Sequence, residues 1–265
     1  MIILSALDLT VAATLVLLLA LLSARVHPTL GKRLAIAACR TTVQLLLVGL
    51  ILKAVFAHVQ LSWVALIALV MVLVAGYEVS ARQSRRFTGW WRFGVGTMSM
   101  FISSFAVTLF ALGVIIGSKP WYAPQYAIPL LGMLLGNTMS GVAIALDRLT
   151  QSAWDQRGRI EARLILGQDW NQAIQDLRHD CIRSGLIPII NAMATAGVVS
   201  LPGMMTGQIL AGTAPVEAVK YQILIMFLIA TGTGFGTMIA VWVGSRRLFD
   251  ERQRLRLDRL SPPTA

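Results

Sequence analysis

The sequence predicts an all-α, polytopic membrane protein with seven transmembrane helices and a cytoplasmic helix-turn-helix between the fifth and sixth. The chain is 56% hydrophobic and only 13% charged over 265 residues, so it has too few polar side chains to cover a soluble domain. Apolar runs of about 20 residues, the length that crosses a bilayer, recur along it. Basic residues gather between alternate runs, as the loops of one membrane face require.

The predicted spans follow one another as seven apolar runs. The first is expected to remain as a helix rather than to be cleaved as a signal peptide, because Asp8 stands where a basic segment would precede such a peptide. The runs are approximately residues 5–24, 34–56, 61–80, 94–117, 126–147, 183–200 and 217–243. We expect residues 1–265 to form a single membrane domain.

The distribution of basic residues predicts the orientation. Clusters of arginine and lysine follow the first, third, fifth and seventh runs, and the other loops carry few basic residues, chiefly Lys53 and Lys119. Because basic loops stay in the cytoplasm, the N-terminus is expected outside and the C-terminus inside, in the inner (plasma) membrane. We therefore interpret the net charge of +11 as the result of basic loops that orient the chain in the lipid bilayer, and not as a sign of nucleic-acid binding.

Residues 150–182 form the longest polar segment between two runs. Two short apolar stripes in it predict two helices separated by Gly167, and Asp169 and Gln172 have the spacing of a capping box at the start of the second. The stripes are Ile160 and Leu164, then Trp170, Ile174, Leu177 and Cys181. A helix lying on the membrane surface is the alternative. The tail, residues 245–265, is expected to continue the last helix into the cytoplasm.

Polar side chains inside the spans are the candidates for a substrate path, because such groups are costly in lipid and normally face a partner or a wet cavity. They are Arg40, Gln44, Glu78, Asn137 and Asn191. Arg40 and Gln44 lie four apart on one helical face, and Glu78 is a possible partner of Arg40. Snorkelling is the alternative for the arginine, and hydrogen bonding between helices is the alternative for the asparagines.

An uncharged stretch from Ser184 to Val216 contains a Ser-Leu-Pro-Gly break at residues 200–203. Irregular backbone at membrane depth is tolerated only beside protein or water, so the break predicts a transport path. The candidate gate comprises Ser200, Leu201, Pro202, Gly203, Met204, Met205 and Gln208. The glycine-rich run 231–237 is interpreted as helix packing or local unwinding and not as a channel filter.

No motif for covalent chemistry or nucleotide hydrolysis is present, including the phosphate-binding Gly-x-x-x-x-Gly-Lys-Ser/Thr loop. Cys39 and Cys181 are far apart in sequence and suit neither a disulfide framework nor a Cys-x-x-Cys metal site. The methionines offer soft ligands, but no metal site is predicted. The sequence therefore favours a transport subunit over an enzyme.

Three segments resemble the FetB-type ABC transporter permeases, which include bacterial iron-export permeases and plant aluminium-tolerance permeases. They are Ser200–Gly212 followed by Pro215–Ile223, Ile128–Asn137, and Arg40–Gln44 through Lys53. The resemblance covers nearly the whole chain. It implies a permease, in a homodimer, that pairs with a separate cytoplasmic ABC ATPase. ATP and magnesium would be bound by that ATPase, and no cofactor by this chain.

The same resemblance gives the polar segment a role. Glu161, Ala162, Arg163, Leu164 and Gly167 resemble the Glu-Ala-Ala-x-x-x-Gly loop that inserts a short helix of a permease into its ATPase, with Arg163 in place of the second alanine. The implied function is export of iron or another metal, with sugar nucleotides as a further substrate class. An ion-gradient-driven secondary transporter or channel, with a cation site at Glu78, is the alternative.

Overall fold

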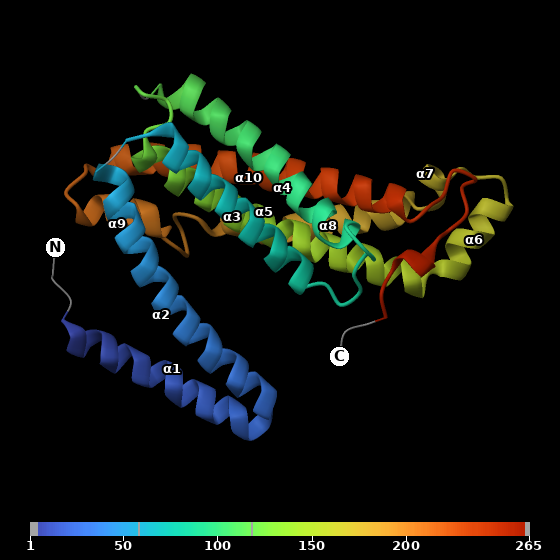
Figure 1. The fold of residues 1–265 in the computed structure, drawn as a ribbon, viewed down its shortest axis with the longest axis horizontal. Coiled ribbons are helices and arrows are strands. Elements are labelled where there is room, and N and C mark those ends of the chain that lie inside the picture. The colour runs from blue at the N-terminus through green and yellow to red at the C-terminus, as the bar shows by residue number, and fades with distance from the viewer. Residues whose placement is uncertain (1–4, 58, 118, 263–265) are drawn as a thin grey trace. The chain divides into compact units, whose positions relative to one another are not determined.

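The fold comes from a computed structural model that describes residues 5–57, 59–117 and 119–262. These residues form ten α-helices and contain no strand, which confirms the all-α class (Figure 1). The chain divides into two compact units, Met1–Gln60 and Leu61–Ala265.

The first unit is a hairpin of two long helices, α1 (Ala6–Val26) and α2 (Pro28–Ala57). Ser5 and Asp8 form a capping box that satisfies free amide groups at the start of α1. The helices pack closely near the turn, where a Cβ on Gly31 would lie 2.5 Å from the Ala20 carbonyl oxygen. Most large apolar side chains of both helices are exposed within the unit, as expected for surfaces that meet lipid or another protein.

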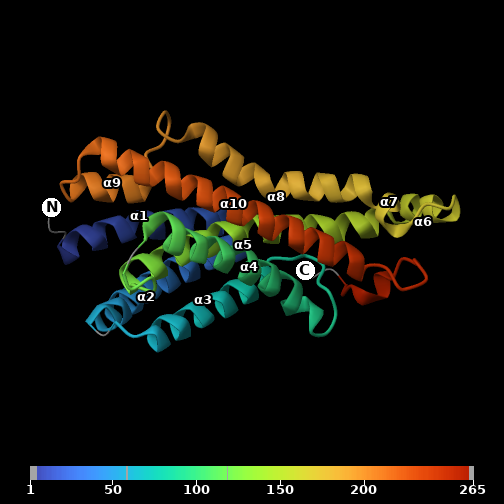
Figure 2. The ribbon, with the colours of Figure 1, turned by 90° about the horizontal axis from the view of Figure 1, so that it is seen from above.

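The second unit is built around α5 (Pro124–Asp155). This helix packs against α3 (Leu61–Ala81), α4 (Trp91–Phe110), α8 (Gln175–Thr195) and α10 (Pro215–Arg247). A π-helical turn, Ala111–Ile116, extends α4, and three short helices complete the unit: α6 (Arg157–Ile165), α7 (Trp170–Ala173) and α9 (Gly203–Leu210). Figure 2 shows α8 and α9 following the course of α10 one after the other.

Glycines bring α5, α8 and α10 into close contact. A Cβ on Gly185 of α8 would lie 2.7 Å from the Gly141 carbonyl oxygen of α5, and one on Gly236 of α10 would lie 2.5 Å from Thr138 Cγ2 of α5. Small residues at such positions let helix backbones approach each other in a membrane. Because α10 runs unbroken through residues 231–237, the interpretation of this run as packing is confirmed for Gly232 and Gly236, whose added Cβ atoms would meet α5.

Six helical segments of the described chain are long and apolar enough to cross a membrane. They are Leu7–Val26, Thr29–Lys53, Leu61–Ala81, Trp91–Ile116, Pro124–Asp155 and Pro215–Arg247. The remaining predicted span, 183–200, falls on α8, which begins earlier and ends at Thr195. Its first half carries Asp176, Arg178, Asp180 and Arg183, so the whole helix is not apolar enough to be counted. The seventh span stays a prediction.

The polar segment differs from the predicted pair of helices. Gly167 adopts the left-handed conformation, with φ of 88°, and separates α6 from α7, which Asp169 and Gln172 begin with a capping box as predicted. The second helix breaks at Ile174, whose backbone leaves the helical range, and α8 then continues directly into the predicted sixth span. The cytoplasmic location of this segment stays a prediction.

The prediction that the tail continues the last helix is wrong. The α10 helix ends at Arg247, and the chain turns back with Gln253 at a φ of 59°. Leu248, Phe249 and Leu260 are buried, and Phe87 forms an isolated antiparallel bridge with Leu260. Burial of these apolar side chains stabilises the folded tail against the loop before α4.

Candidate functional site

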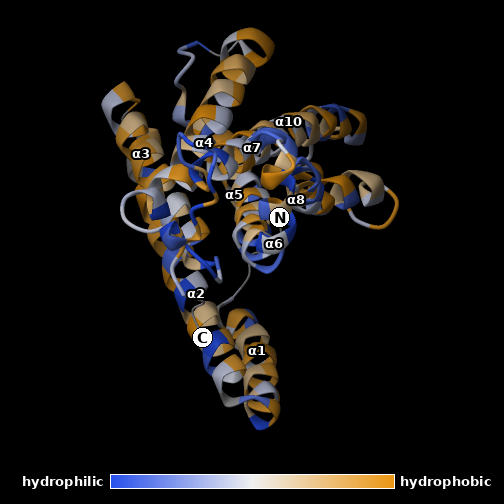
Figure 3. Cartoon of the chain, turned by 90° about the vertical axis from the view of Figure 1, so that its right-hand side faces the viewer, coloured by the Kyte–Doolittle hydropathy of each residue, from blue (hydrophilic) through white to orange (hydrophobic). Residues whose placement is uncertain are grey.

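Segments that are far apart in sequence meet at one end of the second unit, which we call the arginine-rich end: residues 82–92, 148–183 and 246–262. Ser84 donates its backbone N–H to Asp147 Oδ1 at 2.6 Å, and Thr150 Oγ1 donates to the Arg85 carbonyl at 3.0 Å. Ser261 N–H donates to the Arg86 carbonyl at 2.7 Å. In Figure 3, which faces this end, hydrophilic residues gather around α6 and α7, whereas α3 is mostly hydrophobic. The structure thus brings together three of the four basic loops that the sequence assigned to one membrane face, namely those after the third, fifth and seventh predicted spans.

The α6 helix is fixed to the start of α8 by charge and by packing. Arg163 Nη2 lies 2.5 Å from Asp176 Oδ2, and Arg159 Nη2 lies 3.2 Å from the same oxygen. The hydrogen bond from Arg163 and its positive charge lower the pKa of Asp176 below its usual value. Ile160 is buried in the core of the unit. A displacement of α6 would therefore be transmitted to α8.

The helices α6 and α7 form a second hairpin, and the turn at its tip exposes large apolar side chains. Ile165 and Leu166 are 85% and 81% exposed, on a segment that is otherwise polar. A depression of about 540 Å³ lies beside them. It is lined by residues 164, 165 and 167–169 and by residues 252–254 of the tail. Of the predicted coupling residues, Glu161 and Ala162 are exposed and Leu164 is partly buried. Two adjacent exposed apolar side chains, beside a depression on a polar projection, form a candidate protein-binding surface.

The predicted gate lies at the opposite end of α8, where the helix is broken. The chain leaves α8 at Ala196, passes through Gly197 with a φ of 81°, and resumes a helix at Gly203 after Pro202. Three successive amides, of residues 198–200, hydrogen-bond to the Thr195 carbonyl. They satisfy part of the backbone that the break would otherwise leave unpaired. The sequence-based prediction of non-helical backbone here is confirmed, although the break begins before Ser200.

A cavity of about 510 Å³ adjoins the break. Leu201, Pro202 and Met205 of the predicted gate line it, and the lining residues from α8 and α10 include Met193, Gln222 and Met226. Gln222 is only 8% exposed, and its Oε1 atom has no hydrogen-bond partner among the described residues. A largely apolar cavity with one unpaired acceptor is suited to bind a ligand. Gln222 was missed in the sequence, where it is an isolated amide inside the seventh apolar run.

The five predicted path residues are divided between the two units. Arg40 and Gln44 lie on α2 in the first unit, so the pairing of Arg40 with Glu78 of α3 stays a prediction. The Glu78 carboxylate lies 3.9 Å from Arg82, the residue directly after the end of the same helix. Asn137 is exposed and donates from Nδ2 to the Met133 carbonyl at 2.8 Å, also within its own helix.

Asn191 is also exposed, on α8, and its carbonyl accepts from Thr195 Oγ1 at 2.9 Å. Within the described residues, no three His, Cys, Asp or Glu side chains are grouped to hold a metal ion. The features that the geometry supports are therefore the exposed apolar tip at Ile165 and Leu166, the connection of α6 to α8 and the cavity at the break.

These features define a multi-pass helical membrane protein with a projecting polar hairpin at one end and a broken helix toward the other. The chain belongs to the UPF0014 family, described as an uncharacterised protein family, whose model matches residues 6–249. It is 40% identical to the UPF0014 membrane protein slr1647 of Synechocystis sp., over 82% of this chain and 83% of the relative.

Two further relatives have more informative names. The chain is 31% identical to the probable iron export permease protein FetB of Escherichia coli, over 94% of this chain and 93% of the relative. It is 32% identical to the protein ALUMINUM SENSITIVE 3 of Arabidopsis thaliana, over 81% and 77% of the two chains. No solved structure matches the chain. The expected family is thus confirmed.

Proposed function

We propose that this chain is the membrane-spanning permease subunit of an ABC transporter that exports iron or another metal. A separate cytoplasmic subunit binds ATP and magnesium and hydrolyses the nucleotide. The likeness to a relative named as an iron export permease supports the substrate class. The exposed apolar tip supports the partner, and it is the observation on which the proposal rests.

The tip is proposed to enter a groove of the ATPase. Burying Ile165 and Leu166 in a partner would remove two large apolar side chains from water, each contributing about 1.5–3 kcal/mol when fully buried. The neighbouring charges of Arg252 and Arg254 would meet the polar rim of such a groove. The helix and turn that present the tip to the ATPase then comprise Glu161, Ala162, Arg163, Leu164 and Gly167.

The α8 helix is proposed to carry the motion of the ATPase toward the gate. Its first residues are bonded to α6 through the Arg163–Asp176 ion pair, and its last residue, Thr195, precedes the break. A helix of 21 residues is about 31 Å long, enough to reach from a hairpin in water into the hydrocarbon core. Closure of two ATPase subunits would thus move the broken segment, residues 196–202, within the membrane.

The substrate path is proposed to include the cavity at the break, together with Arg40, Gln44, Glu78, Asn137 and Asn191. The gate is Ser200–Met205 with Gln208, and rearrangement of this irregular segment would open or close the cavity. Discontinuous helices serve this purpose in transporters because a short unwound segment changes conformation at low cost. The α1–α2 hairpin exposes apolar faces that a second permease copy or lipid would cover.

Docking is tested by co-purification of the permease with its ATPase. Replacing Ile165 and Leu166 with serine should abolish retention of the ATPase and ATP-dependent transport. Val198 and Val199 are a matched control because they are 88% and 79% exposed and lie in the broken segment. Replacing both valines with serine should leave ATPase retention unchanged. Equal retention by both double variants would refute docking through the tip.

The energy source and the orientation need separate tests. In proteoliposomes, metal transport should require both the ATPase and ATP. Transport by the permease alone, driven by an ion gradient, would instead support the secondary-transporter alternative. Tags at the two termini should be accessible from opposite faces of the inner membrane, with the N-terminus outside, if the chain crosses seven times. Labelling of both tags from one face would exclude an odd number of spans.

A further inference from the structure

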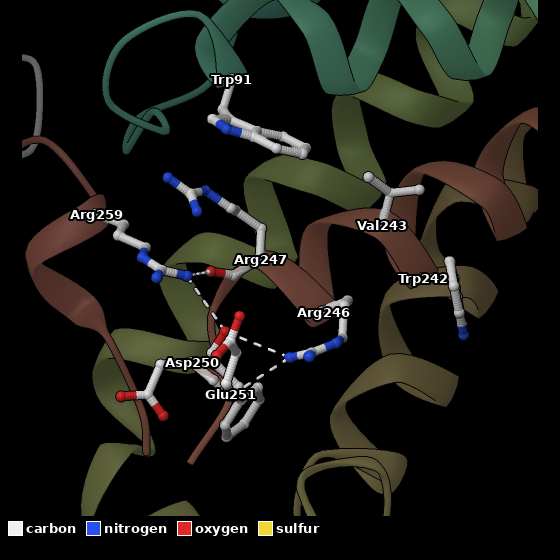
Figure 4. A pocket seen from close by; sticks show the side chains of 9 residues that line it. Trp91, Trp242, Val243, Arg246, Arg247, Asp250, Glu251 and Arg259 are labelled. Carbon is white, nitrogen blue, oxygen red and sulfur yellow. Dashed lines mark hydrogen bonds between the residues drawn. The ribbon is translucent and has the colours of Figure 1, made fainter. Parts of the chain in front are cut away.

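A further pocket, of about 420 Å³, lies at the arginine-rich end between the start of α4, the end of α10 and the tail (Figure 4). Three arginines line it: Arg246, Arg247 and Arg259. Its apolar wall consists mainly of Trp91, Trp242 and Val243. The pocket is separate from the docking tip and from the cavity at the break, so the proposed transport function does not use it.

The three arginines are held in place without being neutralised. The Arg247 guanidinium lies 4.9 Å from the centre of the Trp91 ring, and Arg259 Nη1 donates to the Arg247 carbonyl at 2.8 Å. Arg246 Nη1 donates to the Phe249 carbonyl at 3.4 Å. Within the described residues, none of the three arginines forms an ion pair with a carboxylate.

Nearby acidic groups are mostly engaged elsewhere. Asp250 lines the pocket but lies 2.8 Å from Arg254, and Asp258 of the tail lies 2.8 Å from Arg256. Glu251, which is exposed, is the remaining carboxylate in the lining. The pocket therefore keeps an excess of positive charge, which a bound anion would balance. Guanidinium groups bind phosphate oxygens well because their parallel N–H groups match the spacing of those oxygens.

The apolar wall indicates where this anion comes from. Trp242 and Val243 belong to α10, in the segment long and apolar enough to cross a membrane, and Trp242 is half exposed. Tryptophan is enriched where hydrocarbon meets the headgroups of the bilayer. Basic pockets between membrane helices at this level bind lipid headgroups. A free phosphate ion would make no use of the tryptophans, whereas the glycerol and upper chains of a lipid would cover them.

We propose that this pocket binds the phosphate of an anionic phospholipid, with Arg246, Arg247 and Arg259 around the headgroup and Trp91 and Trp242 against the lipid body. The bound lipid fixes the tail to the start of α4 and the end of α10. It thereby stabilises the surface next to the docking hairpin. This site goes beyond the proposed transport function and is tested without the ATPase.

The first experiment measures binding of short-chain phosphatidylglycerol and phosphatidylcholine to the full chain in neutral detergent by native mass spectrometry. Phosphatidylglycerol should bind more tightly. Because each basic residue near an anionic lipid contributes roughly fivefold in affinity, replacing both Arg246 and Arg247 with glutamine should weaken it at least about tenfold. The matched control replaces Arg157 and Arg159, which do not line this pocket, with glutamine. It removes the same charge and should leave the affinity unchanged.

Two results would overturn the proposal. Equal weakening in the two double variants would show attraction to basic charge in general, and displacement of the lipid by an equal concentration of inorganic phosphate would show a site for free anions. A second measurement avoids arginine variants that fail to fold. Phosphatidylglycerol with brominated chains should quench tryptophan fluorescence of the wild type more than brominated phosphatidylcholine does, and Trp242→Phe should reduce the excess. Equal quenching by the two lipids would also contradict the site.

Discussion

Replacing Gly185 with alanine tests the contact that holds α8 against the core of the second unit. The added Cβ would lie 2.7 Å from the Gly141 carbonyl oxygen, 2.8 Å from Thr237 Cγ2 and 3.0 Å from Ala145 Cβ. The nearest neighbour is a backbone atom of α5, which cannot rotate away as a long side chain could. The substitution therefore forces α8 away from both α5 and α10.

The expected magnitude follows from two opposing effects. Inserting a methyl group into a fully packed contact costs about 1–3 kcal/mol. Alanine in place of glycine inside a helix returns about 0.8–1 kcal/mol, because glycine is the more flexible residue in the unfolded chain. Because the nearest atom belongs to the backbone, the cost should lie in the upper part of its range, about 2–3 kcal/mol. The net destabilisation should then be about 1–2 kcal/mol, or a fall of roughly 2–8 °C in the unfolding midpoint of a chain of this size.

Gly136→Ala is the matched control, since Gly136 also lies inside a long helix, α5, and a Cβ there would meet nothing within 4 Å. Thermal unfolding of the purified proteins in one detergent, at one scan rate, gives the comparison. The Gly136 variant should unfold at or above the wild-type midpoint, and the Gly185 variant should unfold below it. A midpoint for Gly185→Ala equal to that of the control would refute close packing of α8 on α5.

Three further predictions concern the hairpin, the cavity and a buried thiol. Arg163 lowers the pKa of Asp176 in the folded state. This pair therefore stabilises the protein above the unfolded pKa of about 3.9, and the stabilisation is lost as pH falls through the folded pKa. Asp176→Asn should thus lower the midpoint of thermal unfolding at pH 7, and its difference from the wild type should shrink below about pH 4. Gln222→Leu should leave thermal stability unchanged or raise it by about 1 kcal/mol, by removing an unpaired buried acceptor, and should impair transport; full transport would exclude this amide from the path. Cys181 is fully buried, and burial raises its pKa to about 12. In a Cys39→Ser chain, which lacks the exposed thiol, Cys181 should therefore react with a maleimide only after unfolding, and rapid labelling of that folded chain would contradict its burial.

The helical class and most spans could be predicted because they depend on composition and run length, which are local properties. The capping box of Asp169 and the turn at Gly167 were also predictable, since a cap involves residues three apart and a left-handed turn favours glycine. The break after Thr195 followed from the Ser-Leu-Pro-Gly sequence. Each of these features is decided within a few residues of the chain.

The features that sequence could not give depend on distant partners. The tail has the mixed charge of a solvated helix, yet Phe249 and Leu260 are buried; the Leu260 contact involves Phe87, well over a hundred positions earlier. The pocket around Arg247 likewise needs the α4 start and the tail to meet. Gln222 left a weak signal, as a lone amide in an apolar run, but only the cavity beside it distinguishes a binding group from one that bonds to another helix.

The α8 helix explains why the sixth span was difficult to place and why that difficulty bears on function. A helix that only crosses the bilayer is favoured by being apolar throughout, because charged groups in hydrocarbon are costly. Here Asp176 and Arg183 lie in the same helix as the apolar residues that lead to Thr195. In the proposed function, one continuous helix therefore begins in water, bonded to the hairpin that bears Ile165 and Leu166, and ends at the irregular segment beside the cavity. Such a composition is unfavourable for a simple membrane anchor, but it suits an element that transmits displacement from a soluble partner to a gate within the membrane.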